Sequence, residues 1–239
     1  MLITGANKGL GMEAARQLAG RGATVVLGSR NVARGEAAVD ELAAAGADVL
    51  PRQLDVTDVD SVLAAAKWLD TVYGQLDVLV NNAGTVIDRS ADRTTAAEMR
   101  RTFEVNVFGA VTMIQTMLPL LTKSASPRIV NVSSTTASLA LTSGGTDFGG
   151  DADLRMAYSS SKAALNMLTI QYAKAFTESD SLAHIKINSV TPGYTATDMT
   201  GHRGTRTVSE GARIIVDLAM LGDEGPTGGF FNDKGPVPW

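Results

Sequence analysis

The chain has 239 residues, the size of one large α/β domain that needs no disulfide or metal to stabilise its core. It contains no cysteine and only two histidines, which excludes disulfides, cysteine-bound metals and three-histidine metal sites, and we predict no metal site. A net charge of −4, with no apolar run of about 18 residues and no signal-peptide pattern, predicts a cytoplasmic protein without nucleic-acid or membrane partners.

Short apolar runs alternate with helical patterns along the whole chain. Strands are expected at residues 2–3, 23–27, 48–54, 76–80, 128–132, 184–190 and 230–231. Helices are expected at residues 9–20, 31–45, 58–73, 96–121, 158–176 and 209–221. Strands joined by helices form parallel βαβ units, with helices on both faces of the sheet. We therefore predict a single doubly wound, Rossmann-type α/β domain over residues 1–239, with a parallel sheet of about seven strands.

Two of these helices carry local signals. Asp58 can cap the helix at residues 58–73. The apolar residues of that helix recur at the spacing of one face, and we expect them to be buried: Val59, Val62, Leu63, Ala66, Leu69 and Val72. In the helix at residues 96–121, Gly109 and Pro119 are the weak points.

The segment from Thr135 to Met156 has no clear pattern and is rich in Gly, Ser, Thr and Asp. At about 22 residues it is too long for an ordinary connection between elements. We expect an insertion that borders the substrate site and covers the outer face of the following helix. A surface loop without a role in specificity is the alternative.

The first strand runs into Thr4-Gly5-Ala6-Asn7-Lys8-Gly9-Leu10-Gly11 and then into a helix. Gly5, Gly9 and Gly11 allow a tight turn, close approach of the backbone to a pyrophosphate, and close packing of the helix. The amides and the dipole at the helix start favour an anion. The turn predicts a dinucleotide site, with a ligand-free strand–helix turn as the alternative. The GxxxxGK phosphate loop of nucleoside triphosphatases is absent.

Three cations lie where an NAD-binding domain places an acid. The second strand ends in Gly28-Ser29-Arg30, Arg34 follows one helical turn later, and Lys8 lies in the glycine turn. A domain that binds NAD carries an acidic residue for the ribose at this strand end. Positive charge there instead suits the 2′-phosphate of NADPH, so we predict NADPH/NADP as the cofactor. A solvated strand end is the alternative.

Tyr158 and Lys162 lie four residues apart on an expected helix, so their side chains share one face. A free phenol has a pKa of about 10, and a neighbouring cation lowers it toward neutral pH. The pair can then donate or accept a proton at a carbonyl or an alcohol. An exposed pair without a chemical role is the alternative.

Two strands deliver further residues to the carboxyl edge of the sheet, where open α/β sheets bind ligands. The strand at residues 128–132 ends in Ser133-Ser134, and the preceding strand ends in Asn81-Asn82-Ala83-Gly84. We expect a serine hydroxyl near Tyr158, and small residues at 83 and 84 that leave room for a flat ring.

This combination resembles the short-chain dehydrogenase/reductase family over essentially the whole chain. The resemblance rests on Thr4 to Gly11, Asn81-Asn82-Ala83-Gly84, Asn106, Ser134, Tyr158 with Lys162, and Pro192-Gly193. It implies a catalytic tetrad of Asn106, Ser134, Tyr158 and Lys162, with Ser133 as the alternative to Ser134. The implied cofactor-binding residues are Gly5, Asn7, Lys8, Gly9, Leu10, Gly11, Arg30, Arg34, Asp55 and Val56 (against adenine), Asn82, Ala83, Gly84, Tyr158, Lys162, and Pro192, Gly193, Thr195 and Thr197 (at the carboxamide).

Within the family, several segments are similar to the carbonyl-reductase-type members: Asn7-Lys8-Gly9, Ser29-Arg30, Arg34 to Val39, and Gly225 to Gly229 through Trp239. That branch uses NADPH to reduce ketones, aldehydes or quinones. Ser134 and Tyr158 are 24 positions apart, more than in most of the family and fewer than in carbonyl reductases. Only Met1 to Ile3 precede the glycine turn, so the first strand looks short.

The resemblance implies that a carbonyl carbon accepts hydride from NADPH while Tyr158 protonates the oxygen. Ser134 would orient that oxygen, Lys162 would lower the pKa of Tyr158 and hold the nicotinamide ribose, and Asn106 would anchor a water. We expect a small carbonyl compound as substrate and a monomer, with a family-type dimer or tetramer as the alternative. An NADP(H)-binding sensor without turnover, or a methyltransferase with the same sheet, is the competing function.

Overall fold

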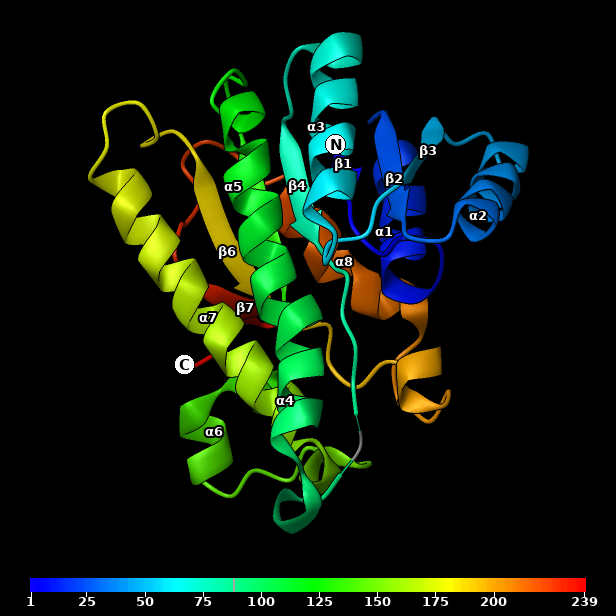
Figure 1. The fold of residues 1–239 in the computed structure, drawn as a ribbon. Coiled ribbons are helices and arrows are strands. Elements are labelled where there is room, and N and C mark those ends of the chain that lie inside the picture. The colour runs from blue at the N-terminus through cyan, green and yellow to red at the C-terminus, as the bar shows by residue number, and fades with distance from the viewer. Residues whose placement is uncertain (88) are drawn as a thin grey trace.

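The computed structural model of the chain describes residues 1–87 and 89–239, and its strands form one sheet of eight (Figure 1). The strands are β1 (Leu2–Ile3), β2 (Val25–Ser29), β3 (Val49–Gln53), β4 (Val78–Asn81), β5 (Arg128–Val132), β6 (Lys186–Val190), β7 (Phe230–Asn232) and β8 (Gly235–Pro236). Their order is β3-β2-β1-β4-β5-β6-β7-β8, with β1 to β7 parallel and β8 antiparallel to β7. The predicted doubly wound sheet is confirmed. The sequence does not predict β8, because a Gly-Pro pair has no strand pattern.

Helices cover both faces of this sheet (Figure 1). One face carries α1 (Gly9–Ala19), α2 (Val32–Ala44) and α8 (Val208–Ala219). The other carries α3 (Val59–Tyr73), α4 (Ala96–Phe103), α5 (Gly109–Leu121) and α7 (Met156–Thr177), and α6 (Leu139–Ser143) is a short helix below α7 in the view of Figure 1.

Alternate residues of each strand point to opposite faces, so the sheet separates two apolar cores. Leu2 belongs to the core that contains Met113 and Met117 of α5. Ile3 belongs to the core that contains Leu18 of α1 and Ile215 of α8. Because both faces are buried, the strands are held firmly, and so are the residues that follow them at the carboxyl edge.

The helical run at residues 96–121 is continuous but changes its hydrogen bonding once. Residues Glu104–Phe108 form a π-helical turn that ends directly before Gly109, the predicted weak point, whereas Pro119 lies inside α5 without ending it. A Cβ at Gly109 would lie 2.7 Å from Cγ2 of Val56, so this contact requires glycine. By length and composition alone the run could cross a membrane, but half of its most apolar stretch is buried inside the protein, as in a core helix.

The buried face of α3 differs from the prediction. Asp58 caps the helix as predicted, because its Oδ1 accepts hydrogen bonds from the backbone N–H of Asp60 and Ser61. However, the side chains that face the core are Val62, Ala65 and Leu69, whereas Val59, Leu63 and Val72 are exposed by half or more. The apolar residues form a band wider than one helix face, and the sheet contacts only the part centred on Val62 and Leu69.

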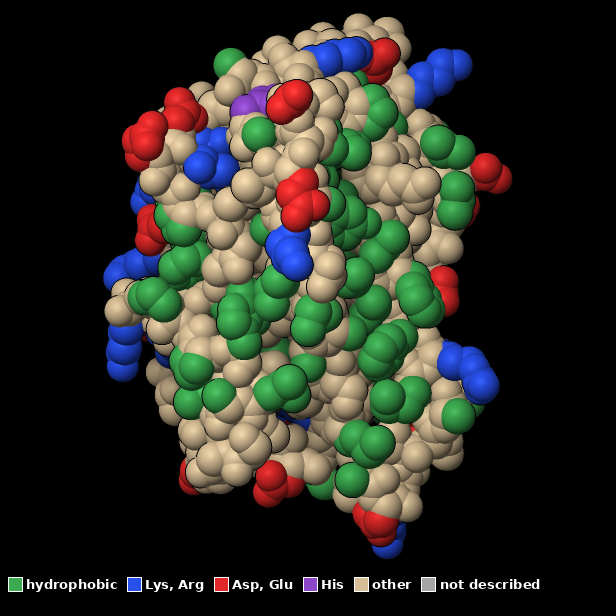
Figure 2. Space-filling view, turned by 90° about the vertical axis from the view of Figure 1, so that its left-hand side faces the viewer, with side chains coloured by type: hydrophobic (Ala, Val, Ile, Leu, Met, Phe, Trp, Pro, Cys, Tyr) green, Lys and Arg blue, Asp and Glu red, His purple; other side chains and the backbone are tan. Residues whose placement is uncertain are grey.

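The segment at residues 135–156 contains short helical turns around α6 and lies at the amino-terminal end of α7. The backbone N–H of Ala140 in α6 donates to the carbonyl oxygen of Trp239. Farther along α7, Met167 is 53% exposed, so the segment does not cover the whole outer face of this helix as predicted. Figure 2, which views the α7 side, shows apolar side chains spread over this surface. Because the segment folds into short helical turns, it is too compact to extend along the whole of α7.

Candidate active site

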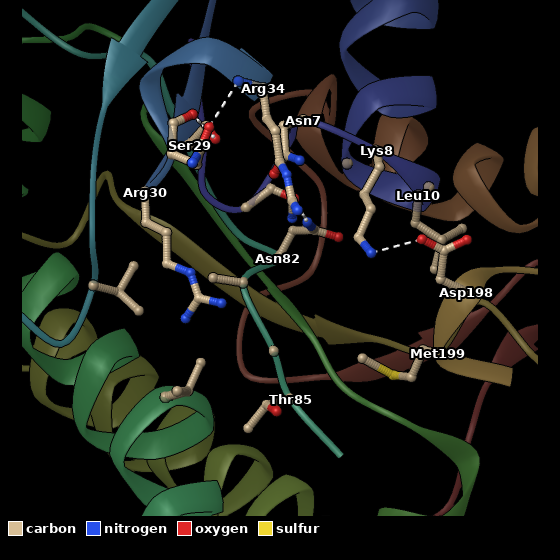
Figure 3. Close-up of a pocket in the computed structure, with 18 of the residues that line it drawn as sticks. Asn7, Lys8, Leu10, Ser29, Arg30, Arg34, Asn82, Thr85, Asp198 and Met199 are labelled. Atoms are coloured by element: carbon tan, nitrogen blue, oxygen red, sulfur yellow. Dashed lines mark hydrogen bonds and ion pairs between the residues drawn. The ribbon is translucent and has the colours of Figure 1, made fainter. Parts of the chain in front are cut away.

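A cavity of about 360 Å³ opens at the carboxyl edge of the sheet; we name it the sheet-edge cleft (Figure 3). It lies where the strand order reverses, between β1 and β4, and open α/β sheets bind ligands at such a point. The predicted cofactor residues that line it are Gly5, Asn7, Lys8, Gly9, Leu10, Gly11, Arg30, Arg34, Asp55, Val56, Asn82, Ala83, Gly84 and Thr197.

Other lining residues are missed by sequence reasoning. They are Ser29, Asn31, Leu54, Thr85, Val105, Asp198 and Met199. Six of them could have been found, because each directly adjoins a residue that the motifs or the resemblance single out: Ser29, Asn31, Leu54, Thr85, Val105 and Asp198. Met199 has no such neighbour.

The glycine turn is packed against the segment that follows β4. Gly5 has a φ of 61°, and a Cβ there would lie 2.9 Å from Cα of Ala83. A Cβ at Gly11 would lie 2.5 Å from the side-chain nitrogen of Asn82. The Asn82 amide donates to the carbonyl oxygens of Thr4 (2.9 Å) and Gly5 (3.1 Å). The side chain of Asn82 therefore holds the turn in shape and leaves its backbone to line the cleft.

The three predicted cations reach the cleft in two different ways (Figure 3). The guanidinium groups of Arg30 and Arg34 project into it, and within residues 1–87 and 89–239 neither makes an ion pair or a side-chain hydrogen bond. Lys8 instead donates from Nζ to Asp198 Oδ2 at 2.6 Å, across the mouth of the cleft. Asp198 also contacts Nε2 of His202 at 2.9 Å. Lys8 therefore lines the cleft as predicted, but its ammonium is paired with a carboxylate 190 positions away in the sequence, and its role toward the phosphate stays a prediction.

The cleft fits a dinucleotide that carries an extra phosphate. Its two carboxylates have partners, because Asp198 is paired with Lys8 and Asp55 accepts from the backbone N–H and the hydroxyl of Thr57. At the end of β2 the hydroxyl of Ser29 donates to a backbone carbonyl, and no carboxylate faces the ribose position among the described lining residues. An anionic group beside β2 would meet two unpaired guanidinium groups.

The loop after β6 contains the remaining predicted cofactor residues, but not all of them reach the cleft. Thr197 lines it, whereas Pro192, Gly193 and Thr195 do not. The Thr195 hydroxyl donates to the carbonyl oxygen of Pro192 at 3.2 Å and is 3% exposed. Ala196 and Arg206 are joined by a backbone hydrogen bond of 2.9 Å, which closes residues 196–206 into a compact loop. Thr195 therefore shapes the loop and holds Thr197 at the cleft.

At the inner end of the cleft lie Ser134, Tyr158, Lys162 and Asn106, which we name the Tyr158 corner. Tyr158 is 8% exposed and Lys162 is 3% exposed. Nζ of Lys162 lies 5.7 Å from the centre of the Tyr158 ring and donates to the carbonyl oxygen of Val132 at 2.7 Å. A Cβ at Gly84, which lines the cleft, would be 3.5 Å from this Nζ. The corner therefore adjoins the cleft although neither Tyr158 nor Lys162 lines it.

Asn106 connects two walls of the site. Its Oδ1 accepts from the backbone N–H of Thr85 at 2.8 Å, and its Nδ2 donates to the Thr85 carbonyl oxygen (3.0 Å) and to the Ser161 hydroxyl (2.9 Å). Both amide hydrogens are therefore used inside the protein. Asn106 ties the segment after β4 to α7, and its role in anchoring a water stays a prediction.

Ser134 and Ser133 have different surroundings. Ser133 is 2% exposed, and its hydroxyl points toward the carbonyl oxygen of Lys162 at 3.4 Å. The Ser134 hydroxyl is 3.0 Å from the hydroxyl of Thr136, and its hydrogen bonding lowers the pKa of Tyr158. The geometry favours Ser134 as the serine that faces the phenol.

A chain of buried amide and hydroxyl groups fixes α7 on the sheet. Nδ2 of Asn81 donates to Oδ1 of Asn131 at 2.9 Å, and Nδ2 of Asn131 donates to the Thr169 hydroxyl at 2.8 Å. The Thr169 hydroxyl in turn lies 2.8 Å from that of Ser189. These bonds connect β4, β5, α7 and β6, and a buried hydrogen-bonded network of this kind makes packing specific. It fixes the rotation and height of the helix that carries Tyr158 and Lys162.

Burial dominates the ionisation of the corner. Burial raises the pKa of Tyr158, while hydrogen bonding by Ser134 and the positive charge of Arg155 lower it. Burial lowers the pKa of Lys162 from 10.5 to about 8. The prediction that Lys162 lowers the pKa of Tyr158 is not confirmed, because the groups that lower this pKa are Ser134 and Arg155. Loss of water on burial has the largest effect on both Tyr158 and Lys162.

Comparison with known proteins supports the same assignment. The model of the short chain dehydrogenase family matches residues 1–207. The chain is 35% identical to (-)-isopiperitenone reductase of Mentha piperita in an alignment that covers 96% of this chain and 95% of that one. It is 32% identical to carbonyl reductase (NADPH) 1 of Pongo abelii, with 100% and 97% covered.

A solved structure is similar over the same extent. The crystal structure of NADPH-bound carbonyl reductase from chicken fatty liver superposes with a TM-score of 0.84 at 28% identity, and covers 100% of this chain and 98% of that chain. The likeness to the carbonyl-reductase-type branch, expected from the sequence, is confirmed by these two carbonyl reductases. With the glycine turn, Asn106, Ser134, Tyr158 and Lys162 in one site, this chain belongs to the short-chain dehydrogenase family.

Proposed function

We propose that the protein is an NADPH-dependent reductase that converts the carbonyl group of a small ketone, aldehyde or quinone to an alcohol. The observation that carries this proposal is the position of Lys162, whose Nζ is buried beside both Tyr158 and Gly84 of the cleft. A protein that only bound a dinucleotide would need the cleft and its cations, but not a phenol and an ammonium at its inner end.

NADP(H) is the cofactor that the cleft suits. The glycine turn of residues 4–11 would hold the pyrophosphate, and Arg30 and Arg34 would hold the 2′-phosphate. The carbonyl reductase from chicken fatty liver, which is similar over the whole chain, is described with NADPH bound. When bound, the reduced nicotinamide supplies the hydride that the carbonyl carbon accepts.

The residues of the corner would handle the proton. Tyr158 would donate its hydroxyl proton to the carbonyl oxygen as negative charge develops there. Ser134 would donate a hydrogen bond to the same oxygen and stabilise that charge. Lys162, fixed by the carbonyl oxygen of Val132, would stabilise the phenolate that remains. Asn106 would keep the Thr85 segment and α7 at a constant separation.

The test is the oxidation of NADPH, followed by its absorbance, over a panel of ketones, aldehydes and quinones. We expect turnover of at least one class and weaker activity with NADH at equal concentration. Binding of NADPH, measured separately by quenching of protein fluorescence, serves as the control. Tight binding without turnover of any class would contradict the proposal and favour a sensor.

A further inference from the structure

Arg155 is a buried cation that the proposed reaction does not use. It precedes α7 by one residue, is 8% exposed, and its Cζ lies 6.0 Å from the centre of the Tyr158 ring. Lys162 approaches the same ring to 5.7 Å. The two residues lie three positions before and four positions after Tyr158, so that both share its face of the helix. The phenol therefore has two buried cations beside it.

The backbone around Arg155 is fixed. The N–H of Arg155 donates to the carbonyl oxygen of Ala152 at 3.1 Å, and Arg155 pairs with Arg89 in an isolated β-bridge. The side chain is buried along with this backbone, so its position beside the Tyr158 ring is constrained. In the neighbouring segment Arg89 is paired with Glu98 at 3.1 Å. Among the described residues, two charged groups lie against Tyr158, namely Arg155 and Lys162. One neutral group, the Ser134 hydroxyl, forms a hydrogen bond with it.

We propose that Arg155 is a positioning residue that stabilises the ionised form of Tyr158, and so sets the pH range in which Tyr158 exchanges a proton with the substrate. This inference rests on the proposed function of Tyr158 as the proton donor. Solvent screens the interaction only weakly, because both residues are more than nine-tenths buried. An opposite charge at about 4–6 Å shifts a pKa by about one unit or more.

Tyr158 needs a different protonation state in each direction of the reaction. In reduction, Tyr158 must carry its proton, which it gives to the carbonyl oxygen as the carbon accepts hydride from NADPH. In oxidation, the phenolate takes the alcohol proton while the carbon-bound hydrogen leaves with its electron pair to NADP⁺. Removal of Arg155 therefore lowers the ionised fraction of Tyr158 about tenfold per unit of pKa at neutral pH, and shifts the pH range in which each direction is fast to higher pH.

The direct test is a spectroscopic titration of Tyr158 in the full chain without cofactor. Tyrosinate absorbs in the near ultraviolet, and the difference between each protein and its Tyr158→Phe counterpart isolates the one phenol. We expect the midpoint to rise by about one unit in Arg155→Gln and Arg155→Met, and to return most of the way in Arg155→Lys. Arg101→Gln, which removes an exposed arginine of α4, is the matched control and should leave the midpoint unchanged.

The pH profiles of oxidation and reduction complete the test. We expect Arg155→Gln to shift the rising limb of oxidation to higher pH with an unchanged plateau. An unshifted midpoint in either uncharged variant, with its thermal melt intact, would overturn the inference. A loss of activity by the same factor at every pH, with no shift of the pH profile in either direction, would do the same, since it indicates a structural role. If the proposed function is wrong, the wild-type protein will show no turnover. The absorbance titration of Tyr158 does not need turnover, so it tests the role of Arg155 separately.

Discussion

The sheet-edge cleft and the Tyr158 corner adjoin one another, but they are built in opposite ways. The cleft is made of backbone turns and exposed cations, and Lys8 is 60% exposed even while it is paired with Asp198. The corner is made of side chains that are almost fully buried, with Tyr158 at 8% and Lys162 at 3%. In the cleft, the exposed cations are free to pair with an anionic ligand or, like Lys8, to leave their present partner for it. In the corner, burial decides the ionisation of each group.

The largest expected effect is in the corner. Tyr158→Phe removes the hydroxyl that donates the proton but keeps the buried ring, so we expect NADPH-dependent reduction to fall by about 10²–10⁴-fold. The measurement is kcat/KM for the best substrate of the panel. NADPH binding should remain within about twofold, because the phenol does not line the cleft. Near wild-type turnover would show that another group donates the proton.

Lys162→Met should separate activity from stability. The pKa of Lys162 is lowered from 10.5 to about 8 in the folded protein, so between these values the unfolded chain binds more protons. The free energy of unfolding of the wild type therefore rises with pH from about 8 to 10.5. Removing the ammonium should increase the stability at pH 7 by up to about 3 kcal/mol and abolish turnover.

The measurement is chemical denaturation of both proteins at a series of pH values. We expect the wild-type stability to approach that of Lys162→Met as the pH rises toward 10.5. In Lys162→Met the Val132 carbonyl oxygen loses its hydrogen-bond donor, which offsets part of the gain in stability. A variant that is less stable than the wild type at every pH would contradict this assignment.

In the cleft, Arg30→Ala and Arg34→Ala should weaken NADPH without affecting NADH. Each guanidinium is unpaired in the described part of the chain, so its whole charge is available to the 2′-phosphate. Charge-assisted hydrogen bonds of this type contribute about 1.5–3 kcal/mol, or about 10- to 100-fold in affinity. Titration with both cofactors checks the ratio. Equal loss for NADH would place these residues at another part of the cofactor.

The smallest effect is expected from Asp198→Asn, which releases Lys8. Exposed ion pairs are weak, so NADPH affinity should increase about two- to fivefold, and NADH affinity should not change. The gain should diminish as the salt concentration increases. In a protein that already carries Lys8→Met, the Asp198→Asn substitution should no longer change the affinity for NADPH. A decrease in NADPH affinity in Asp198→Asn would show that the pair supports the bound state instead.

How far the sequence predicts this molecule depends on the range of the interactions involved. The alternation of strands and helices, the glycine turn and the cap at Asp58 are local patterns, and the structure agrees with them. The residues at the ends of β1, β4 and β5 are brought together by the parallel order of the strands, which the alternation also predicts.

The remaining differences have long-range causes. Lys8 and Asp198 are 190 positions apart, and nothing in the sequence near Lys8 indicates that it forms an ion pair with a carboxylate. The exposed face of α3 depends on where the sheet contacts a broad apolar band. Arg155 lies in a segment without a pattern, most of which is exposed, and its own burial beside Tyr158 has no local signal in the sequence. These features require the packed structure.

The central claim is that the cleft and the corner form one site, and a crystal structure with NADP⁺ bound tests it most directly. The account predicts the 2′-phosphate against Arg30 and Arg34, and the nicotinamide against Gly84 with its reactive carbon facing the Tyr158 hydroxyl. A cofactor bound with its nicotinamide turned away from Tyr158, or with its phosphate remote from both arginines, would contradict the account.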